Sequence, residues 1–395
     1  MPRYIWLLVI ATTISVTGGS FLWPLNTIYM HNELGKSLAF AGFILMFNQG
    51  ASIAGNLIGG ILFDRFSAYK TMLLGTVLSM SASLILSFNH DIVSYSIMLV
   101  LIGFGSGITW PVMFAMAGSV WPEGGRRAFN AIYVAQNLGV ALGATIGGFV
   151  ASISFDYIFI ANASLFAVFF IIVLIAFRGM DEEKNRNMHT SVIEQSGKIQ
   201  DKSAFIALII LSAGFLVTWF AYSQWQSTIA SYTQDIGVPL EQYSSLWAIN
   251  GFLIVLGQPL LRLFTKRVTT TKSHIYIGMT IFIFSYVIAM YAEAFTMFAV
   301  AMVILTIGEM LVWPAIPTLA NALAPHGRAG FYQGFVNSVA AAGRMLGPFL
   351  GGVVVDLYNI KLLFFLLIAL LFIPFITTKL FDRGIQKDEV SKQQI

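Results

Sequence analysis

The chain has little charge and no cysteine, and both absences narrow its class. Only 10% of its 395 residues are charged and 57% are hydrophobic, whereas a soluble domain carries about 25% charged residues. Such a chain cannot cover a water-facing surface, which argues against a soluble enzyme, a nucleic-acid-binding protein and a disordered scaffold. Without cysteine there is no disulfide framework, thiolate metal site or cysteine nucleophile, and the five histidines are scattered. With a mean hydropathy of +0.79, the composition predicts a multispanning membrane protein.

Several functional motifs are also missing from the sequence. It has no G-x4-G-K-[ST] nucleotide loop, so ATP is not expected to drive it. It has neither the glycine-rich filter nor the charged ring of a channel, and no nucleophile–base–acid constellation of an enzyme. We therefore expect neither an enzyme nor a bound cofactor or metal.

Apolar segments long enough to cross a membrane recur along the chain. A hydrocarbon core about 30 Å thick needs about 20 apolar residues per helix, and the segments are far longer than the strands of about ten residues in a transmembrane barrel. Twelve spans are predicted, at residues 5–28, 38–63, 71–89, 93–118, 129–153, 157–177, 204–230, 243–264, 274–292, 295–322, 330–354 and 361–381. The first is long and has few charges before it, so we expect a permanent span and no cleaved signal peptide.

The positive charges predict the orientation of these spans. With the N-terminus in the cytoplasm, 19 of the 22 Lys and Arg residues fall on the cytoplasmic side, against Lys36 and Lys361 outside and Arg344 within a span. The positive-inside rule favours this orientation over its reverse. The basic pI of about 9.1 then reflects topology and contact with anionic lipids, not nucleic acid. We expect a monomeric, multi-pass protein of the cell membrane with both termini in the cytoplasm.

A polar segment divides the spans six and six. Residues 178–203 are mixed in charge and poor in apolar side chains, a composition that predicts a flexible linker. The expected domains are an N-terminal six-helix bundle at 1–177 and a C-terminal bundle at 204–381, followed by a cytoplasmic tail at 382–395.

The two halves repeat each other with an offset near 203 residues. Trp110-Pro111 in the fourth span matches Trp313-Pro314 in the tenth. A glycine series also recurs, as Gly139, Gly143, Gly147 and Gly148 in the fifth span and Gly343, Gly347, Gly351 and Gly352 in the eleventh. Because each half has an even number of spans, both repeats share one orientation. Parallel repeats of this kind build one transporter architecture, whose substrate site lies between the halves near the bilayer midplane.

Three motifs carry a family resemblance over nearly the whole chain. The loop Gly60-Ile-Leu-Phe-Asp-Arg-Phe-Ser-Ala-Tyr-Lys70 resembles the G-x-L-x-D-R-x-G-R-[RK] loop of the major facilitator superfamily, with Ser and Ala in place of the second Gly and the following Arg. Span eleven, with Gly343, Gly347, Pro348, Gly351 and Gly352, resembles the complete G-x3-G-P-x2-G-G motif of the drug/proton antiporter branch, whereas span five has Ala144 at the proline position. Residues 308–319 are similar to the tenth span of multidrug antiporters that carry a membrane-embedded Glu. The resemblance implies an all-α membrane fold of twelve transmembrane helices in two parallel-repeat six-helix bundles.

The resemblance also implies roles for two of these motifs. In that superfamily the acidic loop helps to latch the two halves together on the inner side, which points to Asp64, Arg65 and Lys70. The alternative is a plain solvated loop charge. The glycine series predict close helix packing, which is compatible with a pivot between the halves.

Two ionisable residues lie within predicted spans. An acid at membrane depth is costly and indicates function, and since dehydration favours the neutral carboxyl, Glu309 is the candidate proton-coupling residue. Trp313 follows one turn later on the same helix face. Arg344 stays charged and therefore needs Glu309, backbone carbonyls or an anionic ligand as its partner. A static ion pair between Glu309 and Arg344 is the structural alternative to coupling.

Polar and aromatic residues in the spans that line the cavity in that superfamily are the candidate substrate contacts. They are Trp23, Asn26, Trp110, Trp219, Tyr222, Gln224, Trp225 and Trp313, together with Arg344. For Tyr222 and Trp225 the alternative is an anchoring role at the membrane interface.

The low intramembrane charge suits an amphiphilic, largely apolar cargo. We predict a secondary transporter that exports amphiphilic compounds, drugs included, in exchange for protons by alternating access, with the proton gradient as its energy source. One alternative is a dedicated transporter of a single metabolite, such as an anion anchored by Arg344. Another is a non-transporting sensor or lipid-handling protein, because one fold hosts many activities.

Overall fold

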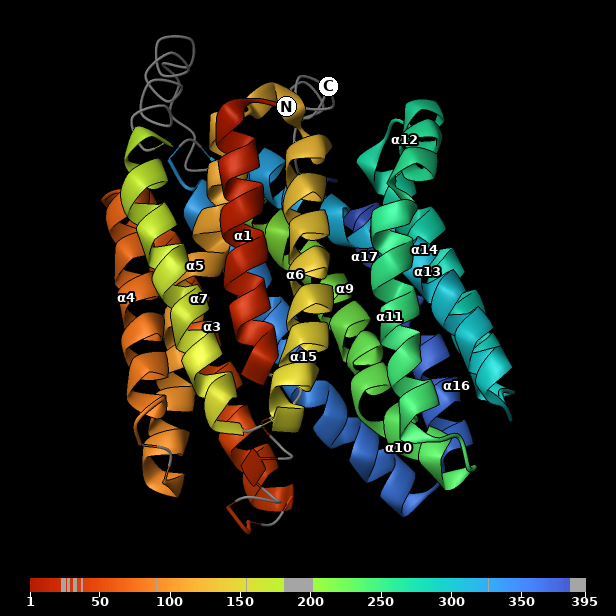
Figure 1. Cartoon of the computed structure of the whole chain (residues 1–395). Coiled ribbons are helices and arrows are strands. Elements are labelled where there is room, and N and C mark those ends of the chain that lie inside the picture. Colours follow the sequence, from red (N-terminus) through yellow and green to blue (C-terminus); the bar gives the residue numbers. More distant parts are fainter. Residues whose placement is uncertain are drawn as a thin grey trace. The chain divides into compact units, whose positions relative to one another are not determined.

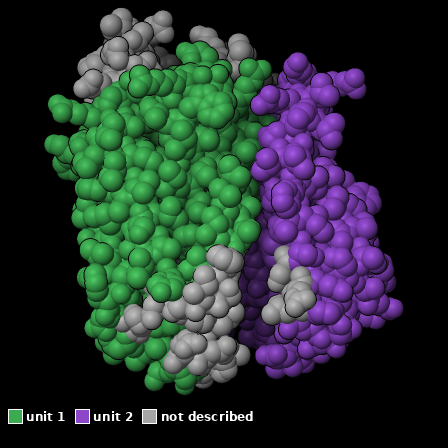
Figure 2. Space-filling view, viewed as in Figure 1, with its two compact units in different colours: residues 1–200, 324–341 green, residues 201–323, 342–395 purple. Residues whose placement is uncertain are grey.

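The computed structural model describes residues 1–22, 26, 29–30, 34–36, 38–89, 91–153, 155–180, 202–325 and 327–383. Within these ranges the regular secondary structure is entirely helical, as the composition predicts. The chain forms two compact units, residues 1–200 with 324–341 and residues 201–323 with 342–395, coloured separately in Figure 2. Most of the predicted linker at 178–203 and of the predicted tail at 382–395 lies outside the described residues.

The helices of the first unit run alongside one another (Figure 1). They are α1 (Arg3–Leu22), α3 (Leu38–Arg65), α4 (Ala68–Leu86), α5 (Ile92–Val120), the short η2 (Pro122–Gly124), α6 (Arg126–Ile153), α7 (Phe155–Ile172) and the π-helical turn η3 (Val173–Phe177). Side chains from loops start several of them. Ser67 accepts a hydrogen bond from the backbone N–H of Lys70 at the start of α4, and Asp91 accepts from the N–H groups of Val93 and Ser94 at the start of α5. These side chains provide acceptors for N–H groups that lack a partner within the helix.

The second unit is divided into more helical segments than the first among the described residues. Its helices are α9 (Lys202–Ser223), the short η4 (Gln224–Gln226), α10 (Thr228–Asp235), α11 (Leu240–Leu256), α12 (Gln258–Arg267), α13 (Thr271–Met290), α14 (Phe295–Leu323), α15 (Ala329–Leu357), α16 (Ile360–Leu370) and α17 (Ile373–Leu380). Helix α15 is continuous, but its residues 329–341 group with the first unit and the remainder with the second.

Ten helices of the described chain are long and apolar enough to cross a membrane, and the bent pair α11 and α12 makes up to eleven. The bend of 56° between this pair falls at Gly257 and Pro259, since proline fits only the first turn of a new helix. The remaining predicted span, 38–63, is helix α3, which has 28 residues. It is long enough to cross, but Asn48, Gln49 and Asn56 dilute its apolar content.

The internal repeat predicted from the sequence is also present in the structure, where equivalent pairs of helices in the two halves make contact at equivalent glycines. A methyl group added to Gly75 of α4 would lie 2.7 Å from the carbonyl oxygen of Gly105 in α5, and one added to Gly278 of α13 would lie 2.9 Å from that of Gly308 in α14. Gly75 and Gly278 are 203 positions apart, and so are Gly105 and Gly308. Only glycine allows two helix backbones to approach so closely.

The glycine series shows the same correspondence. A methyl group on Gly143 of α6 would lie 2.6 Å from the carbonyl oxygen of Thr17 in α1, and one on Gly347 of α15 would lie 2.9 Å from that of Phe220 in α9. Thr17 and Phe220 are again 203 positions apart, whereas the two glycines are 204 apart because of one inserted residue. In each half the helix of the first predicted span therefore packs against the helix of the fifth through equivalent glycines.

Candidate functional site

Glu309 lies in the middle of α14 and is buried, with 2% of its surface exposed. Two side chains from other helices donate to the same carboxylate oxygen, Oε2. The Tyr222 hydroxyl at the end of α9 donates at 3.2 Å, and the Asn250 amide of α11 donates at 2.8 Å. Donors of this kind stabilise a charged carboxylate in a site that has lost its water.

Asn250 also ties α11 to α14 beside the acid. Its Nδ2 atom donates to the Thr306 hydroxyl at 2.8 Å, and Thr306 in turn donates to the carbonyl oxygen of Met302. The sequence-based candidates did not include Asn250. The repeat offered a signal, because Asn48 in α3 precedes it by 202 positions and donates to the carbonyl oxygen of Leu99 in α5. Both units thus use an amide to join equivalent helices, and the second unit also directs it at Glu309.

An aromatic cluster adjoins Glu309. The indole rings of Trp219 and Trp313 are stacked, with centroids 4.6 Å apart and an interplanar angle of 4°. Tyr222 meets both edge-on, at 5.4 Å from Trp219 and 5.3 Å from Trp313. Phe215 and Phe282 complete the cluster with edge contacts to Trp313 at 5.6 and 5.7 Å. We call these five residues the aromatic cluster, and Tyr222 connects it to the acid.

Arg344 reaches the same cluster from α15. Its guanidinium carbon lies 4.5 Å from the centroid of the Trp219 ring, a cation–π contact. The predicted alternative of a static ion pair between Glu309 and Arg344 is not what the structure shows, because the cation lies on the indole ring and the described hydrogen bonds of the acid come from Tyr222 and Asn250.

The other substrate candidates lie elsewhere. Gln224 is fully buried and donates to the carbonyl oxygen of Gly347 at 2.7 Å, so it packs α9 against α15. Asn26 accepts a hydrogen bond from the Tyr95 hydroxyl in the first unit at 2.6 Å. Trp110 packs against the apolar core of that unit. Trp23 lies outside the described residues.

For two of the aromatic residues the sequence leaves an anchoring role at the membrane interface as the alternative. Tyr222 is 5% exposed and bonded to Glu309, and Trp225 has no exposed surface while its carbonyl oxygen accepts from the Tyr243 hydroxyl. An anchor needs its polar edge at the water interface, so this interpretation is wrong for both.

The three predicted latch residues differ in their contacts. Asp64, at the end of α3, accepts hydrogen bonds from the backbone N–H groups of Gly330 at 2.8 Å and Phe331 at 2.7 Å, at the start of α15. These amides have no intrahelical partner, and the positive end of the helix dipole favours a carboxylate. The side chains of Arg65 and Lys70 are exposed. The described contact with α15 is therefore made by the acid alone among the three.

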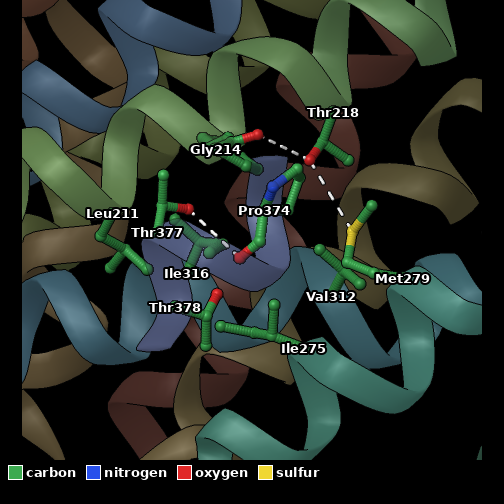
Figure 3. A pocket seen from close by; sticks show the side chains of 11 residues that line it. Leu211, Gly214, Thr218, Ile275, Met279, Val312, Ile316, Pro374, Thr377 and Thr378 are labelled. Atoms are coloured by element: carbon green, nitrogen blue, oxygen red, sulfur yellow. Dashed lines mark hydrogen bonds between the residues drawn. The ribbon is translucent and has the colours of Figure 1, made fainter. Parts of the chain in front are cut away.

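A pocket in the second unit lies among α9, α13, α14 and α17 (Figure 3). Its lining is apolar apart from threonine hydroxyls. Thr218 donates to the carbonyl oxygen of Gly214 and Thr377 to that of Pro374, each within its own helix. The pocket includes Phe215 of the aromatic cluster but neither Glu309 nor Trp313. None of its lining residues is ionisable. In the part of the chain that the structure describes, no group of three or more His, Asp or Glu residues could hold a metal ion.

The comparisons with known proteins agree with this architecture. The profile of the Major Facilitator Superfamily matches residues 8–348 and 214–393. The chain is 54% identical to the "Uncharacterized MFS-type transporter YttB" of Bacillus subtilis over 100% of this chain and 99% of the relative. It is 23% identical to the "Multidrug resistance protein MdtH" of Aeromonas hydrophila over 89% and 87% of the two chains. The crystal structure of the human organic anion transporter MFSD10 (TETRAN) shares the fold, with a TM-score of 0.76 at 13% identity over 96% of this chain and 100% of that one. The chain therefore belongs to the Major Facilitator Superfamily of membrane transporters.

Proposed function

We propose that the protein is a proton-coupled exporter of amphiphilic compounds and that Glu309 is its coupling acid. The observation that carries the proposal is the arrangement of the acid itself. A buried carboxyl group in a membrane-spanning helix is bonded to Tyr222 and Asn250 and adjoins the aromatic cluster.

The chemistry follows from competition at one carboxyl group. A charged carboxylate in a dry site is stabilised by donors and attracts a proton or a cationic or polar group of the cargo. If proton and cargo exclude each other there, the entry of one drives the release of the other. The aromatic cluster supplies the apolar surface that an amphiphile needs, with stacking and cation–π contacts to its rings.

The proposal extends to alternating access. Asp64 caps the N-terminus of α15, the helix whose residues are divided between the two units. Breaking two charge-assisted hydrogen bonds changes the free energy by about 1.5–3 kcal/mol each, which is enough to bias two conformations that differ by a few kcal/mol. We propose that Asp64 favours the conformation in which this contact is formed.

Export of drugs is the finer part of the proposal. It is supported by the complete glycine–proline motif of α15 and by the 23% identity to the multidrug resistance protein of Aeromonas hydrophila. The energy source in this proposal is the proton gradient of the cell membrane.

The test is dye transport into liposomes that contain the purified protein under an imposed pH gradient. The expected result is that the wild type accumulates an amphiphilic aromatic dye against its gradient, whereas Glu309→Gln binds the dye without accumulating it. Glu293→Gln, an exposed acid before α14, serves as the matched control and should behave like the wild type.

Two results would contradict the proposal. Accumulation by Glu309→Gln at the wild-type rate would remove the coupling role of this acid. Failure of the wild type to move any dye from a broad panel would remove drug export, and would leave a dedicated metabolite transporter or a non-transporting protein.

A further inference from the structure

We propose that Arg344 competes with the cargo for one binding surface. Its guanidinium group covers the face of the Trp219 ring until a cationic, aromatic cargo displaces it. The inference rests on the proposed function for the identity of the cargo, but its test measures binding alone. It makes Arg344 a residue that determines specificity and affinity, and it assigns the cargo a positively charged group next to an apolar ring system.

The first support is the set of contacts that the guanidinium makes among the described residues. It lies on the Trp219 ring, with its central carbon 4.5 Å from the ring centroid. Among the hydrogen bonds and ion pairs of the described residues, none involves the Arg344 guanidinium, although it carries five N–H donors. An arginine with a structural role in a membrane span is paired with an acid or with backbone carbonyls. A cation held mainly by a ring can be exchanged for another cation.

The second support is the position of that ring. Trp219 stacks on Trp313, and both contact Tyr222, whose hydroxyl donates to Glu309. A cation that replaces Arg344 on Trp219 therefore lies one side chain away from the buried acid. The exchange also leaves the charge of the site unchanged, because one positive group leaves as another enters. A cation that bound beside Arg344 would instead meet its repulsion.

The third support comes from the internal repeat. The positions equivalent to Trp219 and Arg344 in the first half are Val16 and Val140. The helices α1 and α6 pack there through the same glycines as α9 and α15. The packing of these helices therefore does not require an indole ring or a guanidinium group. The pair is an addition made to one unit, and it lies in the unit that also has the acid.

The opposite role for Arg344 is an anchor for an anionic cargo, because its unused donors would suit a carboxylate or sulfonate. The two roles predict opposite effects of removing the charge. A competitor lowers the affinity for cations, so its removal raises that affinity. An anchor raises the affinity for anions, so its removal lowers that affinity.

The experiment compares two probes of equal shape and opposite charge, tetraphenylphosphonium and tetraphenylborate. Their binding to the purified full-length protein is measured by titration calorimetry at one fixed pH without a gradient. We expect Arg344→Gln to bind tetraphenylphosphonium about tenfold more tightly than the wild type, a change of about 1.4 kcal/mol, and to bind tetraphenylborate no more tightly. Arg344→Lys keeps the charge and should stay near the wild type, which also checks that position 344 tolerates substitution.

A basic residue away from the cluster provides the control. Arg267→Gln, at the exposed end of α12, should leave both affinities unchanged. Unchanged tetraphenylphosphonium affinity in Arg344→Gln would overturn the proposal, and a selective loss of tetraphenylborate binding would establish the anion anchor instead. A protein that shows the expected binding pattern but no proton-driven flux would retain this inference and lose the proposed export function.

Discussion

Glu309 is held by hydrogen-bond donors that lie on two other helices. Tyr222 and Asn250 both donate to its Oε2 atom. The sequence predicted the acid, because a carboxyl group within an apolar span stands out by itself. It could not predict Asn250 as a partner, because the direction of an amide depends on how α11 is rotated against α14. The same limit applies to Gln224, which faces Gly347 rather than the aromatic cluster.

Asn250→Leu should slow proton-driven transport. The leucine side chain has similar volume but no donor, so Glu309 loses one of its hydrogen bonds, and a hydrogen bond to a charged group contributes about 1.5–3 kcal/mol. We expect the rate of dye accumulation under a fixed pH gradient to fall about tenfold, the factor that corresponds to about 1.4 kcal/mol. Asn48→Leu, the equivalent amide of the first unit, is the matched control, and an equal loss in both variants would contradict the assignment.

At the scale of helices, the sequence predicted which segments would be helical more accurately than how each would end. The Gly257-Gln-Pro259 sequence splits one predicted span into α11 and α12 at an angle of 56°, and the amides of α3 lower its apolar content although its length was expected. Helix α15 shows what spacing alone does not indicate. Its residues 329–341 group with the first unit, where Gly330 and Gly334 allow it to pack on α3.

The contact between α3 and α15 provides a test of the latch. Ser338 of α15 is 6% exposed and donates to the carbonyl oxygen of Ile53 in α3, so a cysteine there would be protected while the contact holds. The chain has no native cysteine, which makes the label specific. We expect Asp64→Asn to raise the rate of maleimide labelling of Ser338→Cys about tenfold, since a weakened cap worth about 1.4 kcal/mol shifts the open population by that factor.

Arg65→Gln is the control for this labelling experiment. The Arg65 side chain is exposed, so its removal should leave the rate near that of Ser338→Cys alone. If both variants accelerate labelling equally, the loop charge as a whole controls the contact. If neither does, Asp64 caps α15 without holding the two helices together.

The whole molecule follows one plan used twice, and the candidate site lies where the two halves differ. The contacts of Gly75 and Gly278 recur almost unchanged, and so do those of Gly143 and Gly347. The repeated glycine motif predicted close packing at Gly143 and Gly347, whereas the sequence analysis did not include Gly75 and Gly278. The residues of the candidate site do not recur. Ser106 stands in the first half where Glu309 stands in the second. Sequence repeats therefore predicted the scaffold, and the departures from the repeat mark the site.

The parallel repeat also predicts the same orientation for both halves, and labelling of single cysteines can check this in intact cells. Asn89→Cys, between α4 and α5, and Glu293→Cys, between α13 and α14, occupy equivalent exposed loops. With the N-terminus in the cytoplasm, both should react with a membrane-impermeant maleimide added outside. Phe66→Cys and Thr269→Cys, in the equivalent loops one helix earlier, should react only after the cells are permeabilised. The reverse pattern in all four would invert the orientation derived from the positive charges. Opposite patterns in the two halves would mean an antiparallel repeat and would contradict the even number of spans predicted for each half.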